Sequence, residues 1–131
     1  MRRSPRNRRA MPGLNIVILT DDAERFRGAL TLALAHRALG AHSRIFLQLD
    51  AVCLLAGPYN APRDANHKAQ GLPDLRQLID EALEDGVTLI ACQSGLALTG
   101  LELQSLDRRI EAGGPVSFLQ ALGADDQLII A

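Results

Sequence analysis

Short apolar runs alternate along this chain with segments whose apolar residues recur at helical spacing. This alternation restricts the fold more than any other feature of the sequence. The runs occupy residues 14–19, 43–49, 87–91 and 127–131. Short apolar runs bounded by turn residues are typical of strands buried on both faces. With a further short strand expected within 107–114, the pattern predicts an α/β fold, a doubly wound, mainly parallel sheet of four to five strands flanked by helices.

Capping residues mark where the helices between these runs are expected to begin. Asp21 followed by Glu24 is typical of a helix N-cap, and Asp74 is expected to cap a second long helix. Pro115 favours the first position of a closing helix. Shorter helical segments are expected over 51–56 and 96–103.

The first ten residues differ in charge from the rest of the chain. They hold five arginines and no acidic residue, and beyond them nine basic side chains stand against fifteen acidic ones, a net charge of −6. We predict that residues 1–12 form a basic, disordered arm, or that translation starts at Met11. Residues 13–131 are predicted to form a single domain, whose acidic balance argues against nucleic-acid binding.

Several other classes are excluded by what the sequence lacks. No apolar run reaches the length of a membrane span, and no secretory signal is recognised. Two cysteines do not make a disulfide framework, so a cytoplasmic protein with reduced thiols is expected. The histidines at 36, 42 and 67 lack metal-ligand spacing, and no phosphate-binding glycine motif is present. No metal or other cofactor is therefore predicted.

Cys92 is the strongest candidate for a functional residue. It ends the apolar run 87–91 and precedes the small polar segment Gln93, Ser94 and Gly95. This order predicts a thiol at the carboxyl end of a parallel strand and at the start of a helix, where open α/β sheets bind ligands. Free amides and the helix dipole at such a position favour a thiolate. The alternative is an inert, buried cysteine, which is common for free thiols.

Further polar residues are expected at the same edge of the sheet. Asp21 and Asp50 each follow a predicted strand, and His67 lies in a long polar stretch, residues 57–73, punctuated by proline and glycine. A connection of this length is either a lid over Cys92 or a flexible crossover. His67 is accordingly either a neighbour of Cys92 or an exposed loop histidine.

Cys53 lies among apolar residues a few positions after the second predicted strand. Its surroundings predict a small buried hydrophobe. The alternative is a resolving cysteine for Cys92, which would require the two Cα atoms to lie within about 7 Å of each other.

Three stretches of the chain carry a family resemblance that extends over residues 14–131. Residues 33–52 contain a small-residue helix, a glycine, a strand and an acidic turn. Residues 90–100 contain the end of a strand, then Cys92, then a helix with a glycine eight positions after the cysteine. Residues 113–128 contain a closing helix and strand. This order resembles the DsrE/DsrF-like family, which includes TusD- and YchN-like sulfur-relay proteins.

The resemblance implies a flavodoxin-like, three-layer fold and a role for Cys92 as acceptor of a persulfide sulfur. From their positions in the sequence we expect Gln93, Ser94 and Gly95 to supply amides around Cys92, and Asp21, Asp50 and His67 to supply neighbouring polar groups. It also implies a homo-oligomer, a trimer or hexamer, and a sulfur-donor or sulfur-acceptor protein as partner. The chain departs from TusD-like members at Leu98 and Thr99, where those members carry basic residues. Two alternatives stay open: a non-enzymatic binding or assembly module with a buried Cys92, and a two-cysteine thiol oxidoreductase using Cys92 and Cys53.

Overall fold

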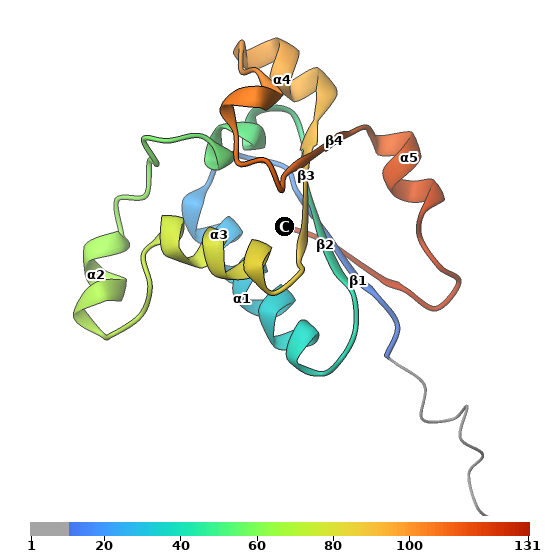
Figure 1. Ribbon diagram of the computed structural model, residues 1–131, viewed down its shortest axis with the longest axis horizontal. Helices are drawn as coiled ribbons and strands as arrows, with labels where there is room; N and C mark the ends of the chain where they lie inside the picture. The colour runs from blue at the N-terminus through green and yellow to red at the C-terminus, as the bar shows by residue number, and fades with distance from the viewer. Residues whose placement is uncertain (1–10) are drawn as a thin grey trace, which may run out of the picture.

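The computed structural model describes residues 11–131, which form a five-stranded sheet with helices on both faces (Figure 1). The disordered basic arm was predicted over residues 1–12. Residues 1–10 lie outside the described part of the chain, so this prediction stays untested there. All strand pairings are parallel, in the order β4-β3-β2-β1-β5, which confirms the predicted doubly wound sheet. The strands are β1 Leu14–Ile18, β2 Ser43–Leu47, β3 Thr88–Cys92, β4 Glu111–Gly113 and β5 Gln127–Ile130.

Five α-helices and two 3₁₀ helices connect these strands in the described residues. They are α1 Ala23–Ala38, η2 Leu49–Leu55, α2 Asp64–Ala69, α3 Leu75–Glu84, α4 Gln93–Thr99, η3 Leu103–Ser105 and α5 Pro115–Gln120. Helix α2 lies within residues 57–73, here named the connecting segment, which was expected to be irregular. The helix expected over 96–103 begins three residues earlier and ends at Thr99, because Gly100 adopts the left-handed conformation with φ of 72°.

The N-terminal caps explain where the two longest helices begin. Asp22, and not the expected Asp21, caps α1: its Oδ1 accepts from the backbone N–H groups of Glu24 at 2.9 Å and Arg25 at 3.1 Å. Asp74 caps α3 as predicted, and with Gln77 it forms a capping box in which each side chain accepts from the other residue's backbone N–H.

Neighbouring residues of β2 show which helices cover each face of the sheet. The Ser43 hydroxyl donates to the Ala33 carbonyl of α1, whereas Arg44 Nη2 donates to the Phe118 carbonyl of α5. Because successive strand residues point to opposite faces, α1 and α5 lie on opposite sides of the sheet. Helix α3 packs beside α1, so one face carries two long helices and the other carries the short α5 (Figure 1).

The α5 face has a smaller apolar core. The rings of Phe46 and Phe118 stack with centroids 5.1 Å apart, and Val17 and Ile90 flank Phe46 in register on β1 and β3. Further out, Leu128 and Ile130 of the edge strand β5 are exposed. No helix among residues 11–131 combines the length and apolar character that crossing a bilayer demands.

Candidate functional site

Cys92 lies at the carboxyl edge of the sheet, as predicted from the sequence. It is the last residue of β3, pairs in register with Gly113 of β4, and is the N-cap of α4. By strand alternation its side chain follows that of Ile90 onto the face covered by α5. The residue is only 2% exposed, so its sulfur is enclosed in the protomer.

The three residues after Cys92 form the first turn of α4. Gln93 and Ser94 are exposed, whereas Gly95 is buried. In the part of the chain that the structure describes, no side chain caps the N-terminus of α4 or binds the backbone N–H groups of this first turn. These amides surround the β3–α4 junction, the position expected for them.

Gly95 also has a packing role at this junction. A Cβ at this position would contact the carbonyl oxygen of Leu49 and would lie 2.9 Å from Cγ1 of Val52. Only glycine lets α4 approach η2 this closely, and η2 follows directly after β2. The glycine thus fixes the segment that carries Cys92 against the segment that carries Cys53.

Cys53 is exposed, and the prediction that it would be buried was wrong. The 3₁₀ turn of η2 directs its neighbours Val52 and Leu54 into the core and Cys53 outward. Partial burial raises the pKa of the Cys53 thiol, and the carboxylates of Asp21 and Asp50 raise this pKa further. The structure therefore places the two predicted acidic residues beside Cys53, where they disfavour its thiolate. Both cysteines are free thiols.

His67 lies on α2, where it bonds to α1. Its Nε2 atom is 2.8 Å from Oε1 of Glu24, and Glu24 also accepts from Nε of Arg27 at 3.0 Å. Within residues 11–131 no hydrogen bond links His67 to Cys92. The connecting segment is thus held against α1 by polar contacts.

The six residues predicted to surround Cys92 lie in three different places. Gln93, Ser94 and Gly95 adjoin Cys92. Asp21 and Asp50 lie near Cys53, and His67 pairs with Glu24.

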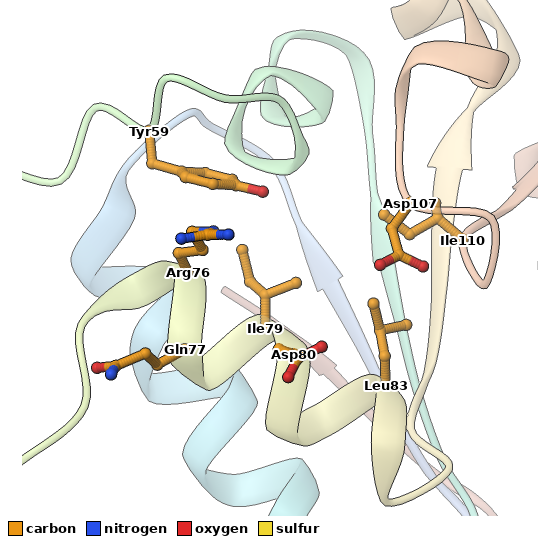
Figure 2. Close-up of a pocket in the computed structure, with 8 residues that line it drawn as sticks. All are labelled: Tyr59, Arg76, Gln77, Ile79, Asp80, Leu83, Asp107 and Ile110. Carbon is orange, nitrogen blue, oxygen red and sulfur yellow. The ribbon is translucent and has the colours of Figure 1, made fainter.

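Sequence reasoning missed a cavity of about 290 Å³ between α3, the connecting segment and the stretch between η3 and β4 (Figure 2). It is lined by Tyr59, Arg76, Gln77, Ile79, Asp80, Leu83, Asp107 and Ile110. Its lining comes from three separate parts of the chain, and no local pattern identifies such a set. No group of three or more His, Cys, Asp or Glu suited to a metal ion occurs in the described residues.

Comparisons with known proteins give a family and a fold. The model of the DsrE/DsrF-like family matches residues 15–130. The solved structure of "Protein of Unknown Function MTH1491" from Methanobacterium thermoautotrophicum is similar at a TM-score of 0.69 and 14% sequence identity, covering 92% of this chain and 99% of that one. At this identity the likeness supports the fold alone. No curated protein sequence matches the chain.

Proposed function

Because the chain belongs to the DsrE/DsrF-like family, we propose that it carries a sulfane sulfur on Cys92 in a relay between thiols. The Cys92 thiolate attacks the outer sulfur of a donor persulfide. A new S–S bond forms on Cys92 while the donor S–S bond breaks, and the donor thiolate leaves with the electron pair. The exchange needs no external oxidant or reductant. A second thiolate, on an acceptor protein, removes the sulfur by the same reaction.

The position of Cys92 is the observation that supports this proposal most directly. It lies at the carboxyl end of β3 and is the N-cap of α4. Within residues 11–131 no side chain, the Cys92 thiol included, bonds to the first-turn amides of α4, which leaves these amides available to a thiolate or a persulfide anion. At Cys53, partial burial, Asp21 and Asp50 all raise the pKa of the thiol, which disfavours the thiolate that would attack a persulfide.

The burial of Cys92 favours a second candidate, a binding or assembly module in which this thiol does not react. A sulfur atom in a residue that is 2% exposed meets no donor unless the β3–α4 junction opens or the donor displaces part of it. The two candidates therefore differ in one measurable property, the access of reagents to the Cys92 sulfur in the folded protein.

Sulfur loading tests the proposal. The folded protein and its C53S and C92S variants are incubated with inorganic polysulfide, and peptides are analysed by mass spectrometry. We expect one added sulfur on Cys92 in the wild-type and C53S proteins, and none at position 92 in C92S. Loading confined to Cys53, or modification of Cys92 only after unfolding, contradicts the proposal and supports the non-reactive module.

A further inference from the structure

The cavity beside α3 has charged groups of opposite sign at its two ends and an apolar floor between them. Figure 2 shows Arg76 and Tyr59 on one side, Ile79 and Asp80 in the middle, and Leu83 beneath Asp107 and Ile110 on the other side. Ile79, Leu83 and Ile110 are buried core residues, so this floor is fixed by the packing of the domain. The volume, about 290 Å³, is near the lower end for small-molecule pockets and equals roughly ten waters of the bulk liquid.

Arg76 supplies an unpaired positive charge at one end. No hydrogen bond or ion pair joins its guanidinium to another side chain within residues 11–131. It also lies in the first turn of α3, where the helix dipole favours negative charge and disfavours a cation. A bound carboxylate would neutralise Arg76 and accept hydrogen bonds from its guanidinium at this end of the cavity.

Asp80, near the middle of the cavity, and Asp107, at the end away from Arg76, supply negative charge. Nη2 of Arg109 lies 2.8 Å from Oδ1 of Asp80 and 2.8 Å from Oδ2 of Asp107, and so bridges the two carboxylates. Hydrogen bonds from Arg109 lower the pKa of Asp107 to about 2, which keeps this carboxylate ionised near neutral pH. The cluster of Arg109, Asp80 and Asp107 therefore carries a net charge of about −1. Within the described residues, Oδ2 of Asp80 accepts no hydrogen bond.

The spacing of these groups follows from α3. Arg76, Ile79, Asp80 and Leu83 lie at positions i, i+3, i+4 and i+7, so they share one face of the helix. Four residues of helix extend about 6 Å, which separates the turn that carries Arg76 from the turn that carries Asp80, and Leu83 lies about one turn further on. The charges of Arg76, Arg109, Asp80 and Asp107 sum to zero, but Arg109 pairs with both carboxylates and Arg76 pairs with no side chain within the described residues.

We infer that this cavity binds a small zwitterion whose carboxylate and ammonium groups are separated by a short apolar body. The carboxylate pairs with Arg76, the ammonium with Asp80 and Asp107, and the methylene groups lie on Ile79 and Leu83. A molecule with one charged group pairs either with Arg76 or with the carboxylates of Asp80 and Asp107, and leaves the other charge without a partner from the ligand. The site does not involve Cys92, so this inference goes beyond the proposed sulfur transfer.

Calorimetric titration with ε-aminocaproate tests the inference, with caproate and hexylamine as probes that each keep one charge. We expect saturable binding of the zwitterion and affinities at least about tenfold weaker for the two single-charge probes. Arg76→Gln and Asp80→Asn should each weaken binding of the zwitterion by about tenfold. Arg25→Gln removes an exposed arginine of α1 outside the cavity and should leave binding unchanged.

Three results overturn the inference: no saturable binding of the zwitterion, caproate binding as tightly as the zwitterion, or unchanged affinity in Arg76→Gln. All three substituted residues are exposed, so the variants should fold, and a thermal melt of each confirms it. Cys92→Ser should bind the zwitterion as the wild type does. Sulfur loading of Cys92 and zwitterion binding can therefore succeed or fail independently.

Discussion

Nη2 of Arg27 lies 2.7 Å from Oδ1 of Asp64, and this ion pair joins α1 to the connecting segment. Arg27 is nearly buried, at 5% exposure, and also bonds to Glu24 and to the carbonyl of Pro73. Oδ1 of Asp64 further accepts from the backbone N–H of Leu75 at 2.9 Å, the first residue of α3. One carboxylate thus ties α1, α2 and the start of α3 together.

Replacing Asp64 by alanine should lower the free energy of unfolding by about 2 kcal/mol, because the buried guanidinium of Arg27 and the N–H of Leu75 each lose a charged acceptor. Urea unfolding followed by circular dichroism measures the change. Asp125→Ala is the matched control, since Asp125 is exposed and makes no side-chain hydrogen bond in the described residues. Equal stabilities for the two variants would show that the Arg27–Asp64 pair contributes nothing.

The same cluster should destabilise the fold in acid. Burial alone would raise the pKa of Glu24 and Asp64, but hydrogen bonds from His67 and Arg27 to Glu24, and from Arg27 to Asp64, hold both pKa values below their ordinary ones. Carboxyls with lowered pKa stabilise the folded state above their ordinary pKa, and this contribution is lost as the pH falls below 4.5 for Glu24 and below 3.8 for Asp64. Urea unfolding at a series of pH values should show the difference in unfolding free energy between wild type and Asp64→Ala shrinking below pH 3.8. A constant difference contradicts the linkage.

Two glycine substitutions should have opposite effects. Gly95→Ala places a Cβ against the Leu49 carbonyl and Val52, and should cost about 1–3 kcal/mol of stability. Gly28→Ala lies in the middle of α1 with no atom within 4 Å of the new Cβ, and should stabilise the protein by about 0.5–1 kcal/mol. Thermal melts of both variants measure the difference, and a destabilised Gly28→Ala would contradict the packing of α1.

Asp50→Asn should accelerate alkylation of Cys53 by iodoacetamide near neutral pH by about two- to threefold. Partial burial raises the pKa of Cys53, and Asp21 and Asp50 raise it further, so removal of one carboxylate increases the thiolate fraction. Mass spectrometry measures the rate at which Cys53 is alkylated, in a protein in which Cys92 is replaced by serine. Asp125→Asn serves as the control. An unchanged alkylation rate in Asp50→Asn would show that Asp50 does not raise the pKa of Cys53.

A homo-oligomer, a trimer or hexamer, remains our prediction. Large exposed apolar residues are most numerous on α5 and β5, where they include Val116, Leu119, Leu128 and Ile130, whereas α4 exposes Leu98. We expect the subunit contact to include α5 and β5. Light scattering at micromolar concentration should give a multiple of the 14.1 kDa protomer, and Ile130→Lys should lower it.

Leu39→Lys changes an equally exposed leucine beyond the C-terminus of α1 and should leave the oligomer intact. A monomeric mass for the wild-type protein contradicts the prediction of an oligomer. Dissociation by Leu39→Lys but not by Ile130→Lys would move the interface away from β5.

The strands were predictable because each is a short apolar run buried by the fold, and burial on both faces leaves a continuous pattern in the sequence. The cap of α1 was misplaced by one residue because Asp21 and Asp22 are chemically identical, and only the backbone conformation at Asp22 selects it. Helix α2 has no apolar face, since none of its residues is buried. Its stabilising contact, Arg27–Asp64, joins residues far apart in sequence and leaves no local pattern.

The candidate site was predictable in its position but not in its exposure. The strand–helix order around Cys92 fixed its place at the edge of the sheet. Whether its sulfur is covered depends on segments elsewhere in the chain, among them η2, which Gly95 lets pack against α4. For Cys53 the apolar neighbours were misleading, because a 3₁₀ turn can bury the residues on either side and still direct one side chain outward.

The position of β5 has a consequence for biosynthesis. Strand β1 is the first strand of this sheet to emerge during translation, and one of its two hydrogen-bonding edges pairs with β5, the last strand of the sheet. The N–H of Ala131 bonds to the Val17 carbonyl, and the N–H of Leu19 bonds to the Ala131 carbonyl. A nascent chain that has already joined β1 to β2, β3 and β4 therefore keeps one edge of β1 unpaired until the end of this domain is released. During that interval the growing polypeptide offers an apolar strand edge to chaperones and to neighbouring nascent chains.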